Sequence, residues 1–397
     1  MCPRRGMRRG VTGTQGRRIV PQRCRLGRAA TLLPVSFSMS VPVTMRQIAE
    51  QADVSIGTVS HVINGTAKVR ERLRLRVLDA IRNLGYQPSQ LGRGLRRNQT
   101  SMLGMIIPDV TNPFFPAVVR GVEDVAYKRS YRVVLCNTDN DPQKETSYLN
   151  ELRSYRPAGL LVIPAAESHI TALLRSLVSS GPPVVCVDRR PAGWDGDVVV
   201  VANEEGSYAA TRHLLRMGHQ HLAVITGPLH LTNASERLKG FRRALDEARV
   251  SIESEYVQEA RFDRPSGYQA ALRLLRMVPR PTAIFACNDM MALGVFLAAR
   301  ELNLACPEKL SIVGFDNLDF AEFTAPALTT VHQPGYQLGA TAARLLLERI
   351  DGLKQRAKKL VLQTELKIRN STAPPWVAEP SSGPRRKQRY IDTVGAR

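Results

Sequence analysis

The sequence lacks the features of a membrane protein or of a disulfide-stapled secreted protein. No run of about 18 apolar residues occurs, so no transmembrane helix and no membrane partner are predicted. The six cysteines are scattered without a CxxC pair, and no histidine stands beside them at a metal-ligand spacing. This pattern is typical of buried thiols in a reducing compartment, so we expect a cytoplasmic protein with no metal site.

Motifs of common enzyme classes are also missing. The chain contains no GxSxG, no phosphate-binding P-loop and no HExxH, and its seven histidines form no spaced set. We therefore expect a protein that is not an enzyme and needs no cofactor.

Acidic residues are scarce, since 56 Lys and Arg stand against 35 Asp and Glu, a formal net charge of +21. Such an excess favours a polyanionic partner, nucleic acid first. Residues 1–28 carry nine arginines and no acid, and residues 1–42 are predicted to be a basic disordered extension. A secretion signal is disfavoured because Pro34, Ser36 and Ser38 interrupt the apolar stretch. The alternative is that translation begins at Met39 or Met45.

Residues 43–86 predict three short helices. Thr44 caps "MRQIAEQA", Ser55 caps a second helix that runs to about Ile63, and "ERLRLRVLDAIRNLG" forms a third that ends at Gly85. Two helices joined by a tight turn and braced by a third make a helix-turn-helix unit.

The second helix has a free face with few groups for reading bases. Helical spacing places Ile56, Gly57, Ser60, His61 and Asn64 on one side and Thr58, Val59 and Val62 on the other. Direct readout normally uses long polar side chains in bidentate pairs. On this face Ile56 can contact a thymine methyl, and His61 can hydrogen-bond to a purine. The arginines that we expect to contact phosphates are Arg70, Arg72, Arg74 and Arg76.

From residue 101 onward the sequence pattern changes to short β-rich runs that alternate with amphipathic helices. The strand candidates are "MLGMIIP", "YRVVLCNTD", "GLLVIPA", "PVVCVDR", "HLAVITG", "AIFACND" and "LSIVGFDN". Strands alternating with helices predict parallel sheets covered on both faces. Two sets of strands, before and after about residue 203, predict two α/β lobes. The tail 372–397, rich in Pro and Ser, is predicted to be disordered.

Three segments in order, "TMRQIAEQADVSIGTVSHVING", "LGYQPSQLGRGLRR" and the α/β body, resemble the lactose-repressor (LacI) family over about residues 43–370. "TVSHVIN" and "ALTTVHQP" especially resemble its purine-repressor branch. The resemblance implies an N-terminal all-α helix-turn-helix head over 43–86, a hinge over 87–100 and a periplasmic-binding-protein-like α/β body over 101–371. That body has two doubly wound parallel-sheet lobes, one of about 101–202 and 334–352 and one of about 203–333 and 353–371.

The resemblance also implies which residues meet DNA. Ile56, Gly57 and His61 stand where the family reads bases, and Leu95 stands where a leucine wedges into the minor groove. Gly92 and Gly94 replace the usual alanine and serine, so the hinge should depend on DNA and dimerisation to become helical. The complete expected set is Thr44, Ser55, Ile56, Gly57, Thr58, Ser60, His61, Asn64, Arg93, Leu95 and Arg96.

A ligand site between the lobes is implied in the same way, from positions that hold a sugar in ribose-binding relatives. These are Asn112, Phe114, Phe115, Asp188, Arg189, Arg237, Asn288, Asp316 and Gln333. Aromatic faces suit the C–H side of a sugar ring, and charged and amide groups suit its hydroxyls. Where the purine branch has an arginine and a tryptophan, this chain has Leu231 and Arg189, which favours a sugar over a purine.

The sequence therefore predicts a repressor that binds a palindromic operator as a homodimer and is released by a small sugar. Dimerisation is expected through the body, including a helix such as "GATAARLLLERI". The alternatives are a purine-dependent repressor and an exported periplasmic sugar-binding protein. The last would leave the head and hinge without a role.

Overall fold

The computed structural model describes residues 43–86, 100–165 and 167–376, which fall into two compact units that divide after Gln87. The predicted extension, most of the hinge and most of the tail lie outside these residues. The expected DNA contacts Arg93, Leu95 and Arg96 lie outside them as well.

The first unit is the predicted head of three helices, α1 (Met45–Ala52), α2 (Ile56–Asn64) and α3 (Glu71–Leu84). Both predicted caps are present: the Thr44 hydroxyl accepts from the backbone N–H of Gln47, and the Ser55 hydroxyl accepts from that of Thr58. The second and third helices end at Gly65 and Gly85 in the left-handed conformation that favours glycine.

One side chain from each helix meets at the centre of the head. Ile48 of α1, Val59 of α2 and Val77 of α3 are fully buried, with Ala49, Ala52 and Ala80 packed around them. Burying each large aliphatic side chain contributes about 1.5–3 kcal/mol, which a unit of this size needs because its core is small.

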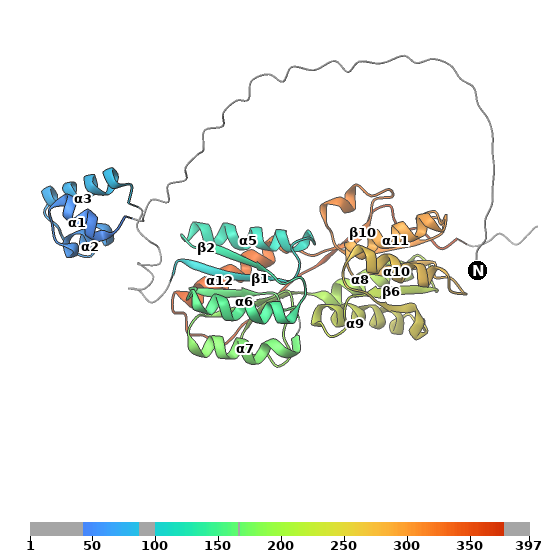
Figure 1. The fold of residues 1–397 in the computed structure, drawn as a ribbon. Coiled ribbons are helices and arrows are strands. Elements are labelled where there is room, and N and C mark those ends of the chain that lie inside the picture. Colours follow the sequence, from blue (N-terminus) through green and yellow to red (C-terminus); the bar gives the residue numbers. More distant parts are fainter. Residues whose placement is uncertain (1–42, 87–99, 166, 377–397) are drawn as a thin grey trace, which may run out of the picture. The chain divides into compact units, whose positions relative to one another are not determined.

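The second unit contains two lobes. The first has the strand order β11-β5-β4-β3-β1-β2 with every pair parallel. Its strands are β1 (Met102–Ile107), β2 (Arg132–Asn137), β3 (Gly159–Val162), β4 (Val184–Val187), β5 (Asp197–Val201) and β11 (Lys359–Leu362). Helices α5 (Phe114–Lys128) and α12 (Gly335–Ile350) cover one face, and α6 (Pro142–Ser154) and α7 (Glu167–Ser180) cover the other (Figure 1).

The second lobe repeats this plan with the order β12-β10-β9-β8-β6-β7, in which only β12 runs antiparallel. Its strands are β6 (Leu222–Thr226), β7 (Val257–Glu259), β8 (Ala283–Ala286), β9 (Ser311–Asp316), β10 (Thr329–His332) and β12 (Glu365–Lys367). Helices α8 (Asn203–Arg216) and α9 (Thr232–Glu247) pack together, as do α10 (Arg264–Leu275) and α11 (Asp289–Glu301). Two short 3₁₀ helices are η1 (Ser254–Tyr256) and η2 (Asp319–Glu322).

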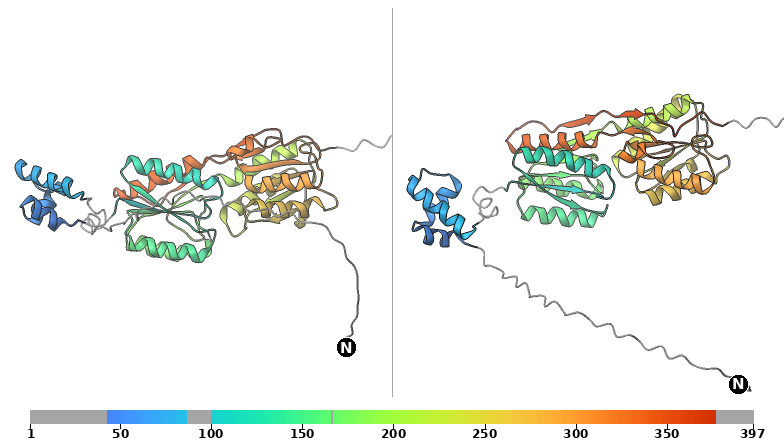
Figure 2. Two further views of the ribbon diagram at one scale, coloured as in Figure 1. Left: turned by 45° about the horizontal axis from the view of Figure 1, so that its top comes forward. Right: turned by 90° about the horizontal axis from the view of Figure 1, so that it is seen from above.

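The chain crosses between the lobes three times: between β5 and α8, between β10 and α12, and between β11 and β12 (Figure 2). The third crossing corrects the expected lobe boundaries. Residues 353–371 were assigned to the second lobe, but β11 pairs with β5 in the sheet of the first. The expected tail also began too early, because the Ala373 N–H donates to the Ser311 hydroxyl at 3.0 Å.

The segment "GATAARLLLERI", which we expect to take part in dimerisation, belongs to a helix of the first lobe. This helix, α12, packs on α5 and on strands of the first lobe, and it buries most of its apolar side chains there. Its part in a dimer stays a prediction.

Two glycines set the contact between α5 and α12. A Cβ at Gly339 would lie 1.9 Å from the carbonyl oxygen of Val118, and a Cβ at Gly121 would lie 2.1 Å from that of Tyr336. Since backbone atoms cannot move aside like the end of a long side chain, only glycine permits this approach.

We expect Gly339→Ala to lower the free energy of unfolding by about 3 kcal/mol, because the added methyl forces two helices apart. Urea unfolding followed by circular dichroism measures this. Gly181→Ala is the matched control, since nothing lies within 4 Å of a Cβ there. Equal stability of the two variants would contradict the proposed close packing.

Candidate functional sites

The exposed face of α2 carries the predicted base-reading residues. Ile56 is 50% exposed, and Gly57 and His61 are also exposed. His61 Nδ1 lies 2.9 Å from the Thr66 hydroxyl, a contact that orients the ring. The other ring nitrogen, Nε2, is then the one available for a hydrogen bond to a base edge.

Ser60 does not lie on this face as expected. It is 8% exposed, and the Asn64 amide donates to its carbonyl oxygen at 2.8 Å and to its hydroxyl at 3.2 Å. Ser60 therefore faces the interior of the head rather than solvent, and the Asn64 side chain folds back along its own helix. Both side chains therefore make hydrogen bonds within the C-terminal part of α2.

The remaining expected contacts of the head are helix caps and arginines. Thr44 and Ser55 cap α1 and α2, whose N-terminal N–H groups can bind a phosphate. Thr58 is half-buried and its hydroxyl lies 3.0 Å from that of Ser55. Arg74 pairs with Glu71 and Arg76 with Asp53, but these pairs are solvent-exposed and add little stability.

A second candidate site lies between the lobes of the body. One cavity is lined by all nine residues predicted from the sequence: Asn112, Phe114, Phe115, Asp188, Arg189, Arg237, Asn288, Asp316 and Gln333. Most follow the carboxyl end of a strand, where open α/β sheets bind ligands. The fold thus brings the whole predicted set together.

The wall from the first lobe combines two aromatic rings with a buried ion pair. Phe114 and Phe115 meet edge to face, with ring centroids 5.3 Å apart. Asp188 Oδ2 lies 3.7 Å from Arg189 Nε, and the Arg189 guanidinium also donates to the Pro164 carbonyl at 2.7 Å. Burial raises the pKa of Asp188, while the two cavity arginines oppose that rise.

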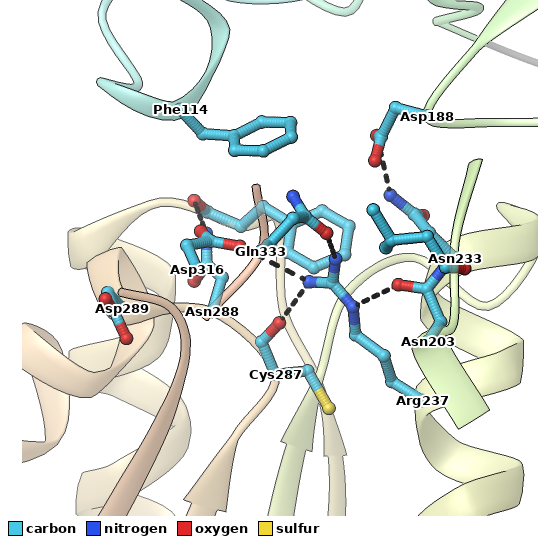
Figure 3. A network of polar contacts seen from close by, with 12 residues as sticks. Phe114, Asp188, Asn203, Asn233, Arg237, Cys287, Asn288, Asp289, Asp316 and Gln333 are labelled. Carbon is cyan, nitrogen blue, oxygen red and sulfur yellow. Dashed lines mark hydrogen bonds and ion pairs between the residues drawn. The ribbon is translucent and has the colours of Figure 1, made fainter. Parts of the chain in front are cut away.

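The wall from the second lobe is organised by Arg237 of α9 (Figure 3). Its guanidinium donates to Asn203 Oδ1 at 2.9 Å, to the Cys287 carbonyl at 2.6 Å and to Gln333 Oε1 at 2.8 Å. It also lies 3.7 Å from the centroid of the Phe315 ring. These contacts fix both position and orientation, so the charge is placed before any ligand arrives.

Two buried carboxyl groups lie in this part of the second lobe: Asp316 lines the cavity, and Asp289 does not. Burial raises the pKa of Asp316 well above its usual value; Arg237 opposes that rise, and neighbouring carboxylates add to it. Burial also raises the pKa of Asp289 to about 7, although the Thr330 hydroxyl and the Leu318 N–H donate to it. Asp316 is held at φ 122°, a conformation that strains a residue with a side chain.

Asn288 has a structural role beside its place in the cavity. Its side-chain oxygen accepts from the backbone N–H of Met291 and so caps α11, and its side-chain nitrogen donates to the Phe262 carbonyl. The amide is therefore largely engaged within the second lobe.

Five further residues line the cavity that the sequence did not point to: Asp109, Asn140, Asn233, Arg261 and Phe262. Asn233 could have been predicted from the sequence, because it precedes Arg237 by about one helical turn and shares its helix face. It donates to Asp188 at 3.0 Å and thereby connects the two lobes. The others lie in loops, where no periodicity marks them.

Comparison with known proteins agrees with this architecture. The model described as "Bacterial regulatory proteins, lacI family" matches residues 44–89, and a "Periplasmic binding protein-like domain" matches residues 211–372. The HTH-type transcriptional repressor PurR of Mannheimia succiniciproducens is 39% identical over 329 residues, which cover 83% of this chain and 98% of that protein. The chain belongs to the LacI family.

Two solved structures show the same likeness. The lac repressor dimer bound to operator and the anti-inducer ONPF is 26% identical, with a TM-score of 0.75, over 84% of this chain and 100% of that one. A LacI-family regulator from Enterococcus faecium with bound ribose is 33% identical, with a TM-score of 0.62, over 69% of this chain and 99% of its own.

As a LacI-family member, the protein is a DNA-binding transcriptional repressor with a ligand-binding domain. Operator DNA and a small-molecule effector are its partners, and the family is one of regulators rather than enzymes. In residues 43–86, 100–165 and 167–376, no helix combines the length and the apolar character that a bilayer span requires.

We expect His61→Ala to weaken operator binding by about 1–3 kcal/mol, because it removes the polar side chain best placed for a base edge. Fluorescence anisotropy with operator and unrelated duplexes measures both affinity and selectivity. Asp79→Ala is the control, since Asp79 is an exposed residue of α3 that pairs only with exposed Arg82 among the described contacts. If His61→Ala keeps full affinity and selectivity, His61 does not read DNA.

Proposed function

We propose that this repressor is released from a near-palindromic operator by a small sugar that binds between the two lobes. The observation that carries the proposal is the single cavity in which aromatic rings, carboxylates, guanidinium groups and amides converge. A sugar ring has apolar C–H faces and hydroxyl groups that both donate and accept, so it matches such a mixed lining.

Two acceptor atoms of the cavity favour a ligand that carries hydrogen-bond donors. Asp188 Oδ1 and Asn233 Oδ1 are buried and have no hydrogen-bond partner among the described residues. A buried acceptor without a partner costs about 1–3 kcal/mol, and hydroxyl donors of a ligand would remove that cost. Arg189 and Arg237 supply donors for the ligand's own oxygens.

The choice of a sugar over a purine rests on two positions. Leu231 precedes α9 and is 2% exposed, so it offers no donor to a base. Arg189 stands beside Asp188 with its guanidinium 6.0 Å from the Phe115 ring, where a stacking tryptophan would favour a planar base. A purine is the second candidate, because relatives with the name PurR are 36–40% identical to this chain.

Release requires that ligand binding change how the lobes sit on each other. Arg237 bonds to Asn203, the first residue of α8 after the first crossing, and to Gln333, which follows β10 at the start of the second crossing. A ligand that hydrogen-bonds to Arg237 would therefore alter contacts at two of the three crossings. We propose that the resulting lobe movement alters the spacing of two heads in a homodimer.

The operator should accordingly contain two half-sites about one helical turn, roughly 34–36 Å, apart. The hinge contacts Arg93, Leu95 and Arg96 belong to this proposal, with Leu95 opening the central step. Since the repressor acts where the chromosome lies, we further propose that it works in the cytoplasm.

We expect a thermal-shift screen of pentoses, hexoses and purines to identify a sugar. At a hundredfold excess over its Kd, a ligand stabilises the folded state by about 2.7 kcal/mol, which raises the Tm by roughly 5–10 °C. Stabilisation by a purine alone would overturn the assignment.

Asp316→Asn should weaken effector binding about 10- to 100-fold, because the amide replaces one of the two carboxyl oxygens with a donor group. Isothermal titration with the sugar identified by the screen measures the change. Asp319→Asn is the matched control, since Asp319 is exposed and does not line the cavity. Equal affinities of the two variants would contradict a ligand contact at Asp316.

A further inference from the structure

The positive charge of the body is unevenly distributed. Residues 100–376 contain 32 Lys and Arg and 29 Asp and Glu, so the body as a whole is close to neutral. In the first lobe the segments that precede β2, β3, β5 and β11 are residues 128–132, 153–158, 193–197 and 349–359, which we call the linker edge. These four segments hold ten of the 32 basic residues and three of the 29 acidic ones.

The name reflects where the chain enters the body. Thr100 is held to this edge, because its N–H and its hydroxyl both donate to the Arg156 carbonyl, at 3.4 and 2.9 Å. Parallel pairing places the starts of all six strands of this sheet along the same edge, away from the effector cavity at their carboxyl ends. The linker that leads to the DNA-binding head therefore leaves from the basic edge.

The second lobe provides an internal comparison. The segments that precede β6, β7, β8 and β9, residues 216–222, 249–257, 276–283 and 302–311, hold five basic and three acidic residues. Both lobes have the same architecture, so the fold itself does not require basic residues at the starts of strands. The excess belongs to the edge that carries the linker.

The acidic residues of the linker edge are neutralised locally. Arg349 donates to both carboxylate oxygens of Asp197, at 2.7 and 2.8 Å, and this pair is buried. Arg129 pairs with Asp351 at 2.8 Å, and Arg175 lies 3.4 Å from Asp195. The surplus of positive charge is therefore left on the exposed surface.

One loop of this edge is held in a fixed shape. Arg349 also donates to the carbonyl oxygens of Leu353, Gln355 and Arg356, at 2.9–3.0 Å. The side chains of Lys354 and Arg356 are exposed on the loop that results. A preorganised loop loses little conformational entropy when these side chains meet a partner.

The tether limits how far this surface can be from DNA. Residues 87–99 separate the described head from the described body, and they span at most about 50 Å when extended. Duplex DNA carries a dense row of phosphates on which lysine and arginine side chains act regardless of sequence.

We propose that the linker edge is a second DNA-contacting surface, which binds phosphates of the duplex close to where the linker reaches it. The base edges remain the task of the head, so these contacts add affinity without adding selectivity. The basic side chains of the linker edge would stabilise the operator-bound state by electrostatic attraction to phosphates, in addition to the contacts that the head makes.

The test is the salt dependence of DNA binding by the full-length triple variant R153Q/K354Q/R356Q. Each phosphate that the protein no longer neutralises reduces the slope of log K against log salt by about 0.9. We expect the slope to become shallower by at least about 2 in the dimer. Affinity at low salt should fall at least about tenfold for operator and unrelated duplex alike, with their ratio unchanged.

The matched control is R216Q/R249Q/R276Q, which removes the same charge from exposed positions of the second lobe. Its slope should equal that of the parent. Equal reductions in both triple variants would mean that only net charge matters, and no reduction in the first would mean that the linker edge serves another acidic partner; either result overturns the proposal. R153K/R356K, which keeps the charge, should retain the parent slope, and unchanged Tm values confirm folding.

Discussion

The buried guanidinium of Arg237 is the interaction on which the body depends. A charge placed in a cavity needs partners on all sides, and this one finds them in Asn203, Gln333, the Cys287 carbonyl and the face of Phe315. These partners come from α8, the second crossing, the end of β8 and β9. One side chain thus joins the ligand cavity to segments that cross between the lobes.

This arrangement supports the proposed coupling between ligand binding and lobe movement. The three crossings are the covalent links between the lobes, and Asn233 adds a hydrogen bond from the second lobe to Asp188 of the first. A ligand inserted among these groups competes with bonds that hold the lobes in one arrangement. Since a ligand shifts an equilibrium only by its differential affinity for two states, these bonds are where that difference arises.

Much of this was visible in the sequence, and the failures have physical causes. The head followed from caps and helical periodicity, and the nine cavity residues followed from the resemblance to ribose-binding relatives. Strands such as β11 and β12 were missed because three or four half-exposed residues give too short a pattern. Ser60 was misplaced because a helical wheel locates a direction and not the neighbouring helices that bury it. Asp109 and Arg261 lie in loops, so only the fold brings them to the cavity.

We propose that Arg237 transmits effector binding to the operator-bound state. Lysine at this position keeps the charge but loses the planar fork that reaches Asn203 and Gln333 together. The decisive measurement is operator affinity by fluorescence anisotropy, with and without saturating sugar, for the parent and Arg237→Lys. The account predicts that sugar weakens operator binding about 5- to 150-fold in the parent and leaves the variant bound. Equal release of both proteins would contradict it.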